Sequence, residues 1–172
     1  MPMPTPTKPG EEPTNESELY RYHFRRLITW YLEALDPLPP ETFSWRPPVA
    51  EAMEANTLAA ICVHAIASAE WWVLSCVGSG PLERDRDAEF AADLSWEELR
   101  PRFQVWLAQV DTLLMDMTGE QFAAISRHPA GDRMNRRCLT HTIEHLGLHL
   151  GHIEITIDWW WASHSTGGAA AE

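Results

Sequence analysis

Four long segments with apolar residues at helical spacing constrain the fold of this chain more than any other feature. They cover about residues 16–35, 57–77, 95–119 and 135–161, and in each a large apolar side chain returns every three or four positions. No segment shows the alternation of apolar and polar residues that is typical of a half-buried strand. Four amphipathic helices with no sheet to pack against predict an all-α protein, folded as a four-helix bundle.

The ends of these helices are marked by residues that start or stop a helix. Ser95 followed by Glu98 has the spacing of a capping box, and Asn56 or Thr57 can cap the second helix. The stop signals are the prolines at positions 37, 39 and 40, the glycines at positions 78 and 80, and Gly119. The connections at 36–55 and 77–94 are long enough to cross the bundle. We therefore expect at least one pair of neighbouring helices that is not antiparallel.

The two ends of the chain differ in composition from the part between them. Residues 1–14 contain five prolines and predict a disordered segment, and residues 165–172 form a Gly/Ala-rich tail with nothing to bury. We therefore expect residues 15–164 to form a single domain with one core, because a chain of this length is a natural size for one domain.

Charge and composition argue against several classes of partner. The net charge is −12 and Lys8 is the only lysine, so a nucleic-acid-binding surface is not expected. No stretch of about 18 uninterrupted apolar residues indicates a membrane span, and the first residues lack the charged-then-apolar pattern of a signal peptide, so we expect neither. The three cysteines show no ligand spacing and fit reduced thiols in a cytoplasm.

The last helical segment carries a stripe of histidines. His141, His145, His149 and His152 fall within an arc of about 80° on the flank of the apolar face, with Leu148 among them. Partly buried imidazoles need polar partners, and a metal ion can supply one. Two histidines four positions apart lie about 6 Å apart along the axis and suit one ion, whereas two that are eight apart, at about 12 Å, do not.

An ion bound by an adjacent pair on this helix needs a ligand from elsewhere in the fold. The best candidate is His64, which stands in the middle of the apolar second segment, where a charged residue would be out of place. His23 in the first segment is a weaker candidate.

Two groups of motifs resemble the DinB/YfiT-like superfamily of metal-dependent helical bundles. One is Leu32-Glu33-Ala34-Leu35, then Leu38-Pro39 and Trp45-Arg46-Pro47, followed by Asn56-Thr57-Leu58, His64 and Glu70-Trp71-Trp72. The other is the stretch at 145–153, which resembles the H-x-x-x-H-R-G-Q pattern of the family. The resemblance implies up-down-down-up connectivity, frequent dimers, and a nickel- or zinc-type ion bound by three histidines. Carried over, these are His64, His145 and His149, with open positions for water or substrate.

The chain departs from that pattern where Leu150 and His152 replace the usual arginine and glutamine. The resemblance points to thiol-dependent transferases and to a maleylpyruvate isomerase. Our first hypothesis is a metal-dependent transferase or hydrolase that acts on a small molecule, with a low-molecular-weight thiol as a possible cofactor. His141 and His152 are the candidate bases. The alternative is a metal-containing binding or stress-response protein without turnover.

Other residues of the last segment leave alternatives open. Arg133, Arg136 and Arg137 either attract an acidic substrate or thiol cofactor, or pair with nearby carboxylates. Cys138 is a ligand, a reactive thiol or a small buried residue, and the last is favoured. Tryptophans at consecutive positions, 71–72 and 159–161, cannot all face inward, so some meet a partner chain, a ligand or the tail.

Two other kinds of metal site are disfavoured. His141 to His145 matches H-x-x-E-H, the inverted zinc-peptidase signature, but Glu144 points away from the histidine arc. A di-iron carboxylate bundle needs two Glu-x-x-His pairs, which these helices lack.

Overall fold

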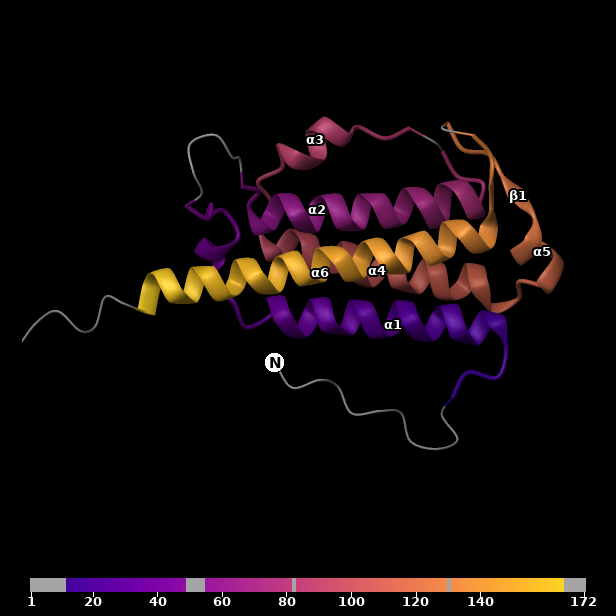
Figure 1. The fold of residues 1–172 in the computed structure, drawn as a ribbon, viewed down its shortest axis with the longest axis horizontal. Helices are drawn as coiled ribbons and strands as arrows, with labels where there is room; N and C mark the ends of the chain where they lie inside the picture. Colours follow the sequence, from indigo (N-terminus) through magenta and orange to yellow (C-terminus); the bar gives the residue numbers. More distant parts are fainter. Residues whose placement is uncertain (1–11, 49–54, 82, 130, 166–172) are drawn as a thin grey trace, which may run out of the picture.

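Four long helices form the bundle in the computed structural model, which describes residues 12–48, 55–81, 83–129 and 131–165. They are α1 (Glu16–Leu35), α2 (Leu58–Ala69), α4 (Trp96–Met115) and α6 (Asn135–Ser165) (Figure 1). A π-helical segment, η2 (Glu70–Val77), continues α2. The predicted all-α four-helix bundle is confirmed, and the helix directions in Figure 1 are compatible with up-down-down-up order.

Side chains cap the starts of the first three long helices, and at Thr57 and Ser95 these are the caps predicted from the sequence. The side chain of Asn15 accepts a hydrogen bond from the Glu18 amide, and that of Thr57 accepts one from the Ala60 amide. Ser95 and Glu98 form the predicted capping box. These caps satisfy amide groups that have no partner within their own helix, and so they fix where each helix begins.

Two predicted helix ends are wrong. The third long helix ends at Met115, and Gly119 instead opens the short helix α5 (Gly119–Ala123), which Thr118 caps. The last helix continues through Ser165, which its composition placed in the tail. A helix end is decided by the packing of its final turn, which local signals report poorly. The predicted disorder at residues 1–11 and 166–172 falls outside the described residues.

Several short elements have no counterpart in the prediction. They are η1 (Pro40–Thr42), α3 (Arg86–Phe90), α5, and the strands β1 (Ile125–Ser126) and β2 (Arg133–Met134). The strands pair antiparallel, Ile125 with Met134 and Ser126 with Arg133. The expectation of no strand is wrong here because two residues are too few to show an alternating pattern.

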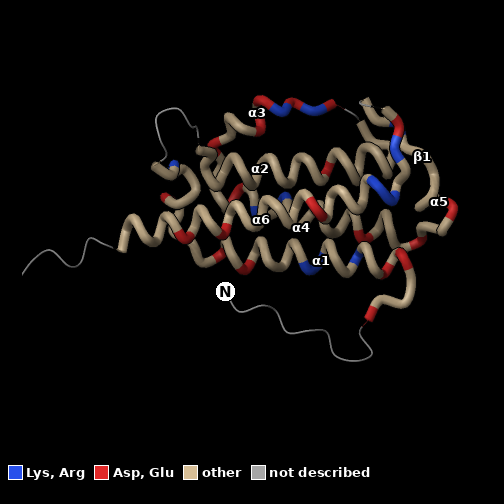
Figure 2. Tube along the Cα trace, viewed as in Figure 1, with Lys and Arg blue, Asp and Glu red and all other residues tan. Residues whose placement is uncertain are grey.

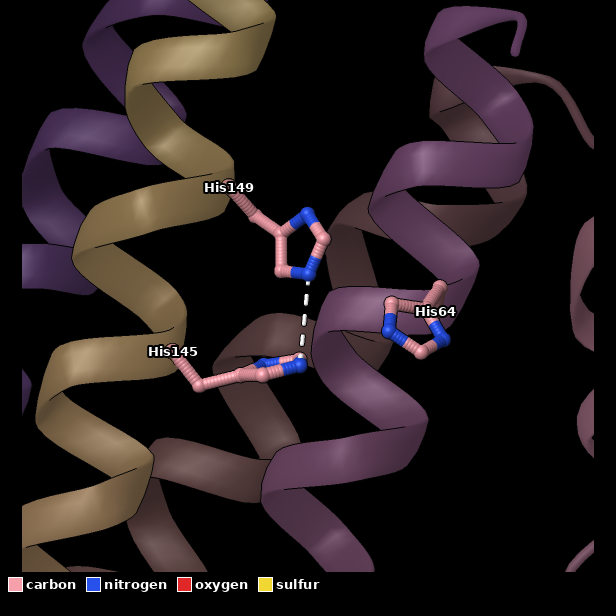
Figure 3. Close-up of side chains that lie close together, drawn as sticks. All are labelled: His64, His145 and His149. Atoms are coloured by element: carbon pink, nitrogen blue, oxygen red, sulfur yellow. Dashed lines mark hydrogen bonds between the residues drawn. The ribbon is translucent and has the colours of Figure 1, made fainter. Parts of the chain in front are cut away.

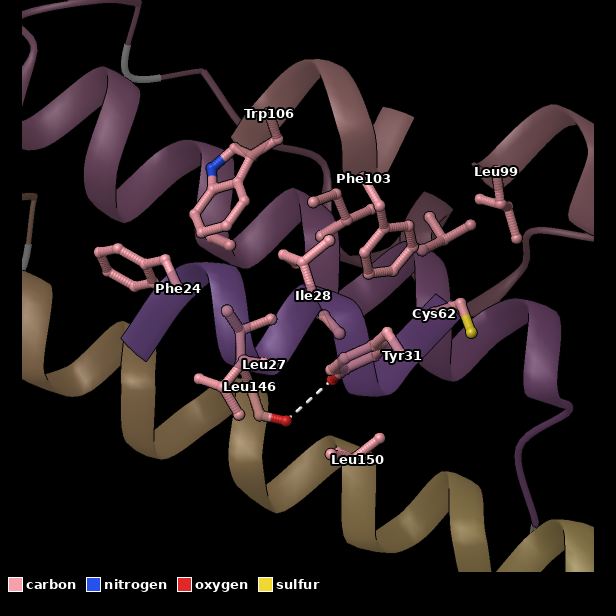
Figure 4. Close-up of a cluster of buried hydrophobic side chains, with 14 of the residues drawn as sticks. Phe24, Leu27, Ile28, Tyr31, Cys62, Leu99, Phe103, Trp106, Leu146 and Leu150 are labelled. Carbon is pink, nitrogen blue, oxygen red and sulfur yellow. Dashed lines mark hydrogen bonds between the residues drawn. The ribbon is translucent and has the colours of Figure 1, made fainter. Parts of the chain in front are cut away.

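The core between α1 and α4 is built from large rings (Figure 4). Phe24 meets Trp106 edge to face with ring centroids 5.3 Å apart, and Tyr31 lies 5.1 Å from Phe103. All four rings are fully buried. The Tyr31 hydroxyl donates a hydrogen bond of 2.9 Å to the backbone carbonyl of Leu146 and so ties this core to α6.

Helix α2 is buried on every side. Eleven of its 12 residues are buried, because it packs against α6, α3 and α4. Residues 58–77 are also long and apolar enough for a membrane-spanning helix, with a mean hydropathy of 1.5. In the apolar segment tested, 61% is buried inside the fold. The core helix of a globular bundle meets the same criterion, and the burial of α2 fits that role.

Candidate metal centre

Three histidines from two helices meet between α2 and α6 (Figure 3). His64 comes from the middle of α2, and His145 and His149 stand one turn apart on α6. One ring nitrogen from each lies within 4.8 Å of the others, and the Nε2 atoms of His145 and His149 are 3.2 Å apart. The structure therefore brings together the three residues that the sequence and the resemblance proposed.

The spacing of these nitrogens is near the spacing of the ligands of a divalent ion. Zinc–nitrogen bonds are about 2.0–2.1 Å long, so two ligands of a tetrahedral ion lie about 3.3 Å apart and no two ligands exceed about 4.2 Å. The pair on α6 already has that separation, at 3.2 Å. Only a small rotation of the rings is needed to bring nitrogens within 4.8 Å around one ion.

Burial keeps the three imidazoles neutral. Loss of water, helped by the neighbouring imidazoles, lowers the pKa of His145 to about 3 and that of His149 to about 4. Burial also lowers the pKa of His64. Neutral imidazole is the form that binds a metal, because a ring nitrogen then has a free lone pair. At neutral pH a cation therefore does not have to displace a proton from a charged imidazolium ring.

The outer nitrogens of the two imidazoles on α6 lack the hydrogen bonds that usually support a metal ligand. The Nδ1 atoms of His145 and His149 are buried, and among the described residues neither has a hydrogen-bond partner. Leaving such a group unsatisfied costs about 1–3 kcal/mol. An ion bound through Nε2 would leave these Nδ1 groups unpaired, so the fit to the metal that the resemblance implies rests on the donor set, three neutral imidazoles whose ligand nitrogens lie within 4.8 Å of one another.

The opposite side of the His64 ring is held by the short helix α3 and the residues before it. Nδ1 of His64 lies 2.8 Å from Oε2 of Glu89, and Phe90 stacks on the ring with centroids 4.4 Å apart. Arg84 grips the same carboxylate through Nε and Nη2, at 2.5 and 2.7 Å. Burial by itself would raise the pKa of Glu89, but hydrogen bonds with Arg84 and His64 hold it below the usual value.

Sequence reasoning missed Glu89 and Arg84. They stand in the run Glu83-Arg84-Asp85-Arg86-Asp87-Ala88-Glu89, where charges of both signs resemble an ordinary solvated loop. Only the fold distinguishes Glu89, which is 5% exposed, from its exposed acidic neighbours. No signal in the sequence separates them.

The two candidate bases lie beside the trio rather than in it. His141 is half-buried, with its ring centroid 5.6 Å from His145 and 4.6 Å from Trp72. His152 is exposed, and its ring centroid lies 5.5 Å from His149. Leu148, predicted among the semi-buried histidines, is 58% exposed.

The three arginines at the start of α6 do not act as one cluster. Arg136 is committed to Glu16 through a pair of hydrogen bonds at 2.6 and 2.8 Å. Arg133 donates to the backbone carbonyl of Gly131, and Arg137 is exposed. For Arg136 the structure favours the alternative of simple pairing with a carboxylate.

Two other features of α6 fit the simpler interpretations. Cys138 is fully buried, and burial raises the pKa of its thiol, which makes it a small core residue rather than a reactive one. Glu144 is exposed, away from the three imidazoles, so the inverted zinc-peptidase arrangement is not formed. His23 is absent from the group of three histidines found among the described residues.

The tryptophan runs divide between core and surface. Trp160 is buried, whereas Trp159 and Trp161 are 48% and 46% exposed. Trp71 and Trp72 are half-buried, and Trp72 stacks on His128 with ring centroids 4.4 Å apart. Trp72 thereby joins His141 to the loop between β1 and β2.

Comparison with solved structures shows a similar fold. Two solved structures are similar, the mycothiol-dependent maleylpyruvate isomerase and a mutant of that enzyme in which alanine replaces a histidine. Each has a TM-score of 0.56 and 17% sequence identity, with 79% of this chain covered. The match covers only 60% of the enzyme, so the likeness is one of fold. A comparison with curated proteins gives no significant match.

The comparison with protein families decides the classification. The sequence model of the DinB superfamily matches residues 23–153, which include α2, the connection through α3, α4 and all three clustered histidines. The match therefore spans the bundle as well as its candidate metal site. This chain belongs to the DinB superfamily.

Proposed function

We propose that this protein is a metal-dependent enzyme acting on a small molecule, with one divalent ion held by His64, His145 and His149. The observation that carries the proposal is the convergence of three neutral ring nitrogens, within 4.8 Å, from two helices. Imidazole ligands suit nickel and zinc, which are the ions we expect. A three-histidine ion bound in this way keeps positions open for other ligands.

The chemistry of such a site follows from its ligands and surroundings. An ion bound here polarises an oxygen or lowers the pKa of a bound thiol or water. His141 and His152 are the side chains beside the trio that can accept a proton from a substrate, with ring centroids 5.6 and 5.5 Å from the nearest member. Transfer to or from a low-molecular-weight thiol, or hydrolysis, is the reaction class we favour.

The thiol part of the proposal draws on the structural neighbour, whose name states that it depends on mycothiol. Arg137, exposed near the start of α6, is the side chain of the predicted arginine trio that is most accessible to an acidic group of such a thiol. Replacing Arg137 by Ala and finding unchanged affinity for the thiol would remove this residue from the proposal.

A metal-binding protein without turnover is the second candidate, and one observation favours it. Leu150 takes the place of an arginine in the family pattern, and it is buried in the core rather than turned toward the site. The site therefore has no cation at that position to bind an acidic substrate.

Elemental analysis of the purified protein tests the metal site. We expect about one equivalent of nickel or zinc in the wild type and almost none in His64→Ala, because one of three ligands is lost. His152→Ala is the matched control: it removes an exposed histidine of α6 outside the trio and should keep its metal. Equal metal content in wild type and His64→Ala would refute the site.

Activity assays then separate the two candidate functions. The metal-loaded protein is offered glutathione, or another low-molecular-weight thiol, with a panel of electrophiles. Conversion that disappears in His64→Ala supports the enzyme. A protein that binds metal but converts nothing across the panel supports the second candidate.

We also propose a homodimer in the cytoplasm. The outer face of α6 exposes Leu148, Ile155 and Trp159 at helical spacing, and a Cβ added to Gly147 or Gly151 would meet nothing within 4 Å. A second copy of this chain would bury that apolar stripe. Sedimentation equilibrium at twice the monomer mass supports this arrangement, and a monomer at micromolar concentration refutes it.

A further inference from the structure

We infer that Glu89, held by Arg84, is a positioning residue for the metal centre: it binds Nδ1 of His64 and thereby presents Nε2 to the ion. The inference rests on the proposed function, because it presupposes an ion at the three histidines. It adds a contribution from α3, a segment that supplies none of the three imidazoles.

The geometry of the contact is that of a carboxylate fixing a metal-binding imidazole. Oε2 of Glu89 lies 2.8 Å from Nδ1 of His64, and both side chains are 6% exposed. In Figure 3 one ring nitrogen of His64 is turned toward His145 and His149, and the other is turned away from them. A buried contact on the outer nitrogen leaves the inner one for coordination.

The charge on Glu89 decides which nitrogen carries the proton. Arg84 binds both carboxylate oxygens, at 2.5 and 2.7 Å, and this pairing stabilises the ionised form, which can only accept hydrogen bonds. Nδ1 of His64 must then donate, and Nε2 keeps its lone pair. Nη2 of Arg84 also lies 3.4 Å from Nδ1, but the shorter contact of 2.8 Å with the charged carboxylate prevails.

The ring of His64 is held by a second contact from the same short helix. Phe90 stacks on it at 4.4 Å, with 26° between the ring planes. With the hydrogen bond on one edge and the phenyl ring on one face, the imidazole can neither flip nor tilt freely. An ion then meets a ligand whose orientation is already set.

The fold contains a matched ion pair that serves as a control for this contact. Arg102 binds Glu70 through Nε and Nη2 at 2.8 and 2.6 Å. Glu70, Arg102, Arg84 and Glu89 all line one cavity of about 450 Å³. Removing Glu70 therefore perturbs the same wall of the protein and the same type of bond, while the hydrogen bond between Glu89 and His64 stays in place.

The experiment measures zinc affinity by competition with a chromophoric chelator, together with the visible absorption spectrum of the cobalt(II) form. We expect Glu89→Ala to weaken zinc binding about 10- to 100-fold and to change the cobalt bands. Glu89→Gln should bind more tightly than Glu89→Ala, because the amide can still accept a hydrogen bond, but more weakly than wild type, because an amide also donates and no longer fixes the proton. Glu70→Ala should match the wild type in both measurements.

The possible results are distinct. A wild type that binds no ion refutes the proposed function and this inference with it. A wild type that binds zinc while Glu89→Ala binds equally well, or while Glu70→Ala is weakened equally, overturns the inference alone. If circular dichroism shows that Glu89→Ala is unfolded, the comparison of Glu89→Gln with Glu70→Gln tests the inference instead. Equal zinc affinity in those two variants overturns the inference. Weaker zinc binding by Glu89→Gln, with altered cobalt bands, supports it.

Discussion

The α1–α4 half of the bundle and its α2–α6 half are built from side chains of different size. Between α1 and α4 the core consists of Phe24, Tyr31, Phe103 and Trp106. Six of the eleven buried residues of α2 are small, and five of these six are at most 1% exposed: Ala59, Ala60, Cys62, Ala65 and Ala69. Large rings fill the α1–α4 half, whereas small side chains make up much of the buried surface of α2, which packs against α6.

Charge follows the same division (Figure 2). Helix α2 itself carries no Asp, Glu, Lys or Arg, and the acidic Glu70 begins η2. The connection at 83–89 that covers α2 alternates acidic and basic residues. At the rim of the other half, Asp111 of α4 pairs with Arg21 and Arg25 of α1. The large rings of the core therefore lie in the α1–α4 half and the candidate metal site in the α2–α6 half, and we propose that stability and binding divide in the same way.

The largest effect is expected from a substitution that disrupts the α1–α4 core. Phe103→Ala deletes a fully buried ring that packs on Tyr31 and Trp96, and we expect the free energy of unfolding to fall by about 3–5 kcal/mol. Urea denaturation followed by circular dichroism measures the loss. Val105→Ala, on the exposed face of the same helix, is the control and should change the free energy of unfolding by about 0.5 kcal/mol or less.

The zinc affinity of Phe103→Ala, measured at temperatures where the variant is still folded, tests whether stability and metal binding reside in separate halves of the bundle. If stability and binding reside in separate halves, the variant binds zinc as the wild type does. A large loss of affinity in protein that is still folded would show that the ring core also sets the positions of the imidazoles.

A smaller effect is expected where the two halves are joined. Tyr31→Phe removes the hydrogen bond of 2.9 Å to the Leu146 carbonyl, next to His145 in the chain, and keeps the ring in place. We expect a loss of about 0.5–1.5 kcal/mol in the free energy of unfolding. Tyr22→Phe is the matched control, because the Tyr22 hydroxyl makes only a long contact of 3.4 Å with Arg26 among the described residues. An equal loss of unfolding free energy in both variants would contradict the proposal that this hydrogen bond joins the two halves.

How much of this arrangement is visible in the sequence differs between the elements. The long helices are predictable because a 20-residue segment repeats its apolar face several times and because caps such as Ser95 with Glu98 act locally. The pair His145 and His149 is predictable from a spacing of one helical turn, and His64 from its place in an apolar helix. The directions of the helices, and which helices pack against each other, are predicted only by the resemblance to the family and not by the residue pattern itself.

The elements that escape prediction depend on contacts between distant parts of the chain. Helix α3 has five residues, too few to be stable in isolation, and its position is fixed by Glu89 reaching His64, 25 residues away in the sequence. The strands β1 and β2 have two residues each. Local patterns carry no information on such contacts, so the positioning side of the candidate site becomes visible only with the fold.

The smallest expected effect concerns the ion pair at the α1–α4 rim. The hydrogen bond from Arg21 lowers the pKa of Asp111 below its ordinary value of 3.8, and Arg25 contributes in the same direction. Because the folded-state pKa is the lower one, the ion pair stabilises the fold above about pH 4, and this contribution is lost as the pH falls through the folded-state value. Asp111 is only partly shielded from water, so we expect at most about 1 kcal/mol.

Urea midpoints of wild type and Asp111→Asn between pH 7 and pH 2 measure this contribution. The two curves should be separated at neutral pH and converge in acid, because the wild-type carboxyl then also becomes neutral. Asp158→Asn, an exposed position on α6, should run parallel to the wild type throughout. If the urea midpoints of wild type and Asp111→Asn instead differ by a constant amount down to pH 2, the shape of the side chain matters at this position rather than its charge. The ion pair of Asp111 with Arg21 and Arg25 would then make no electrostatic contribution to the stability of the α1–α4 half.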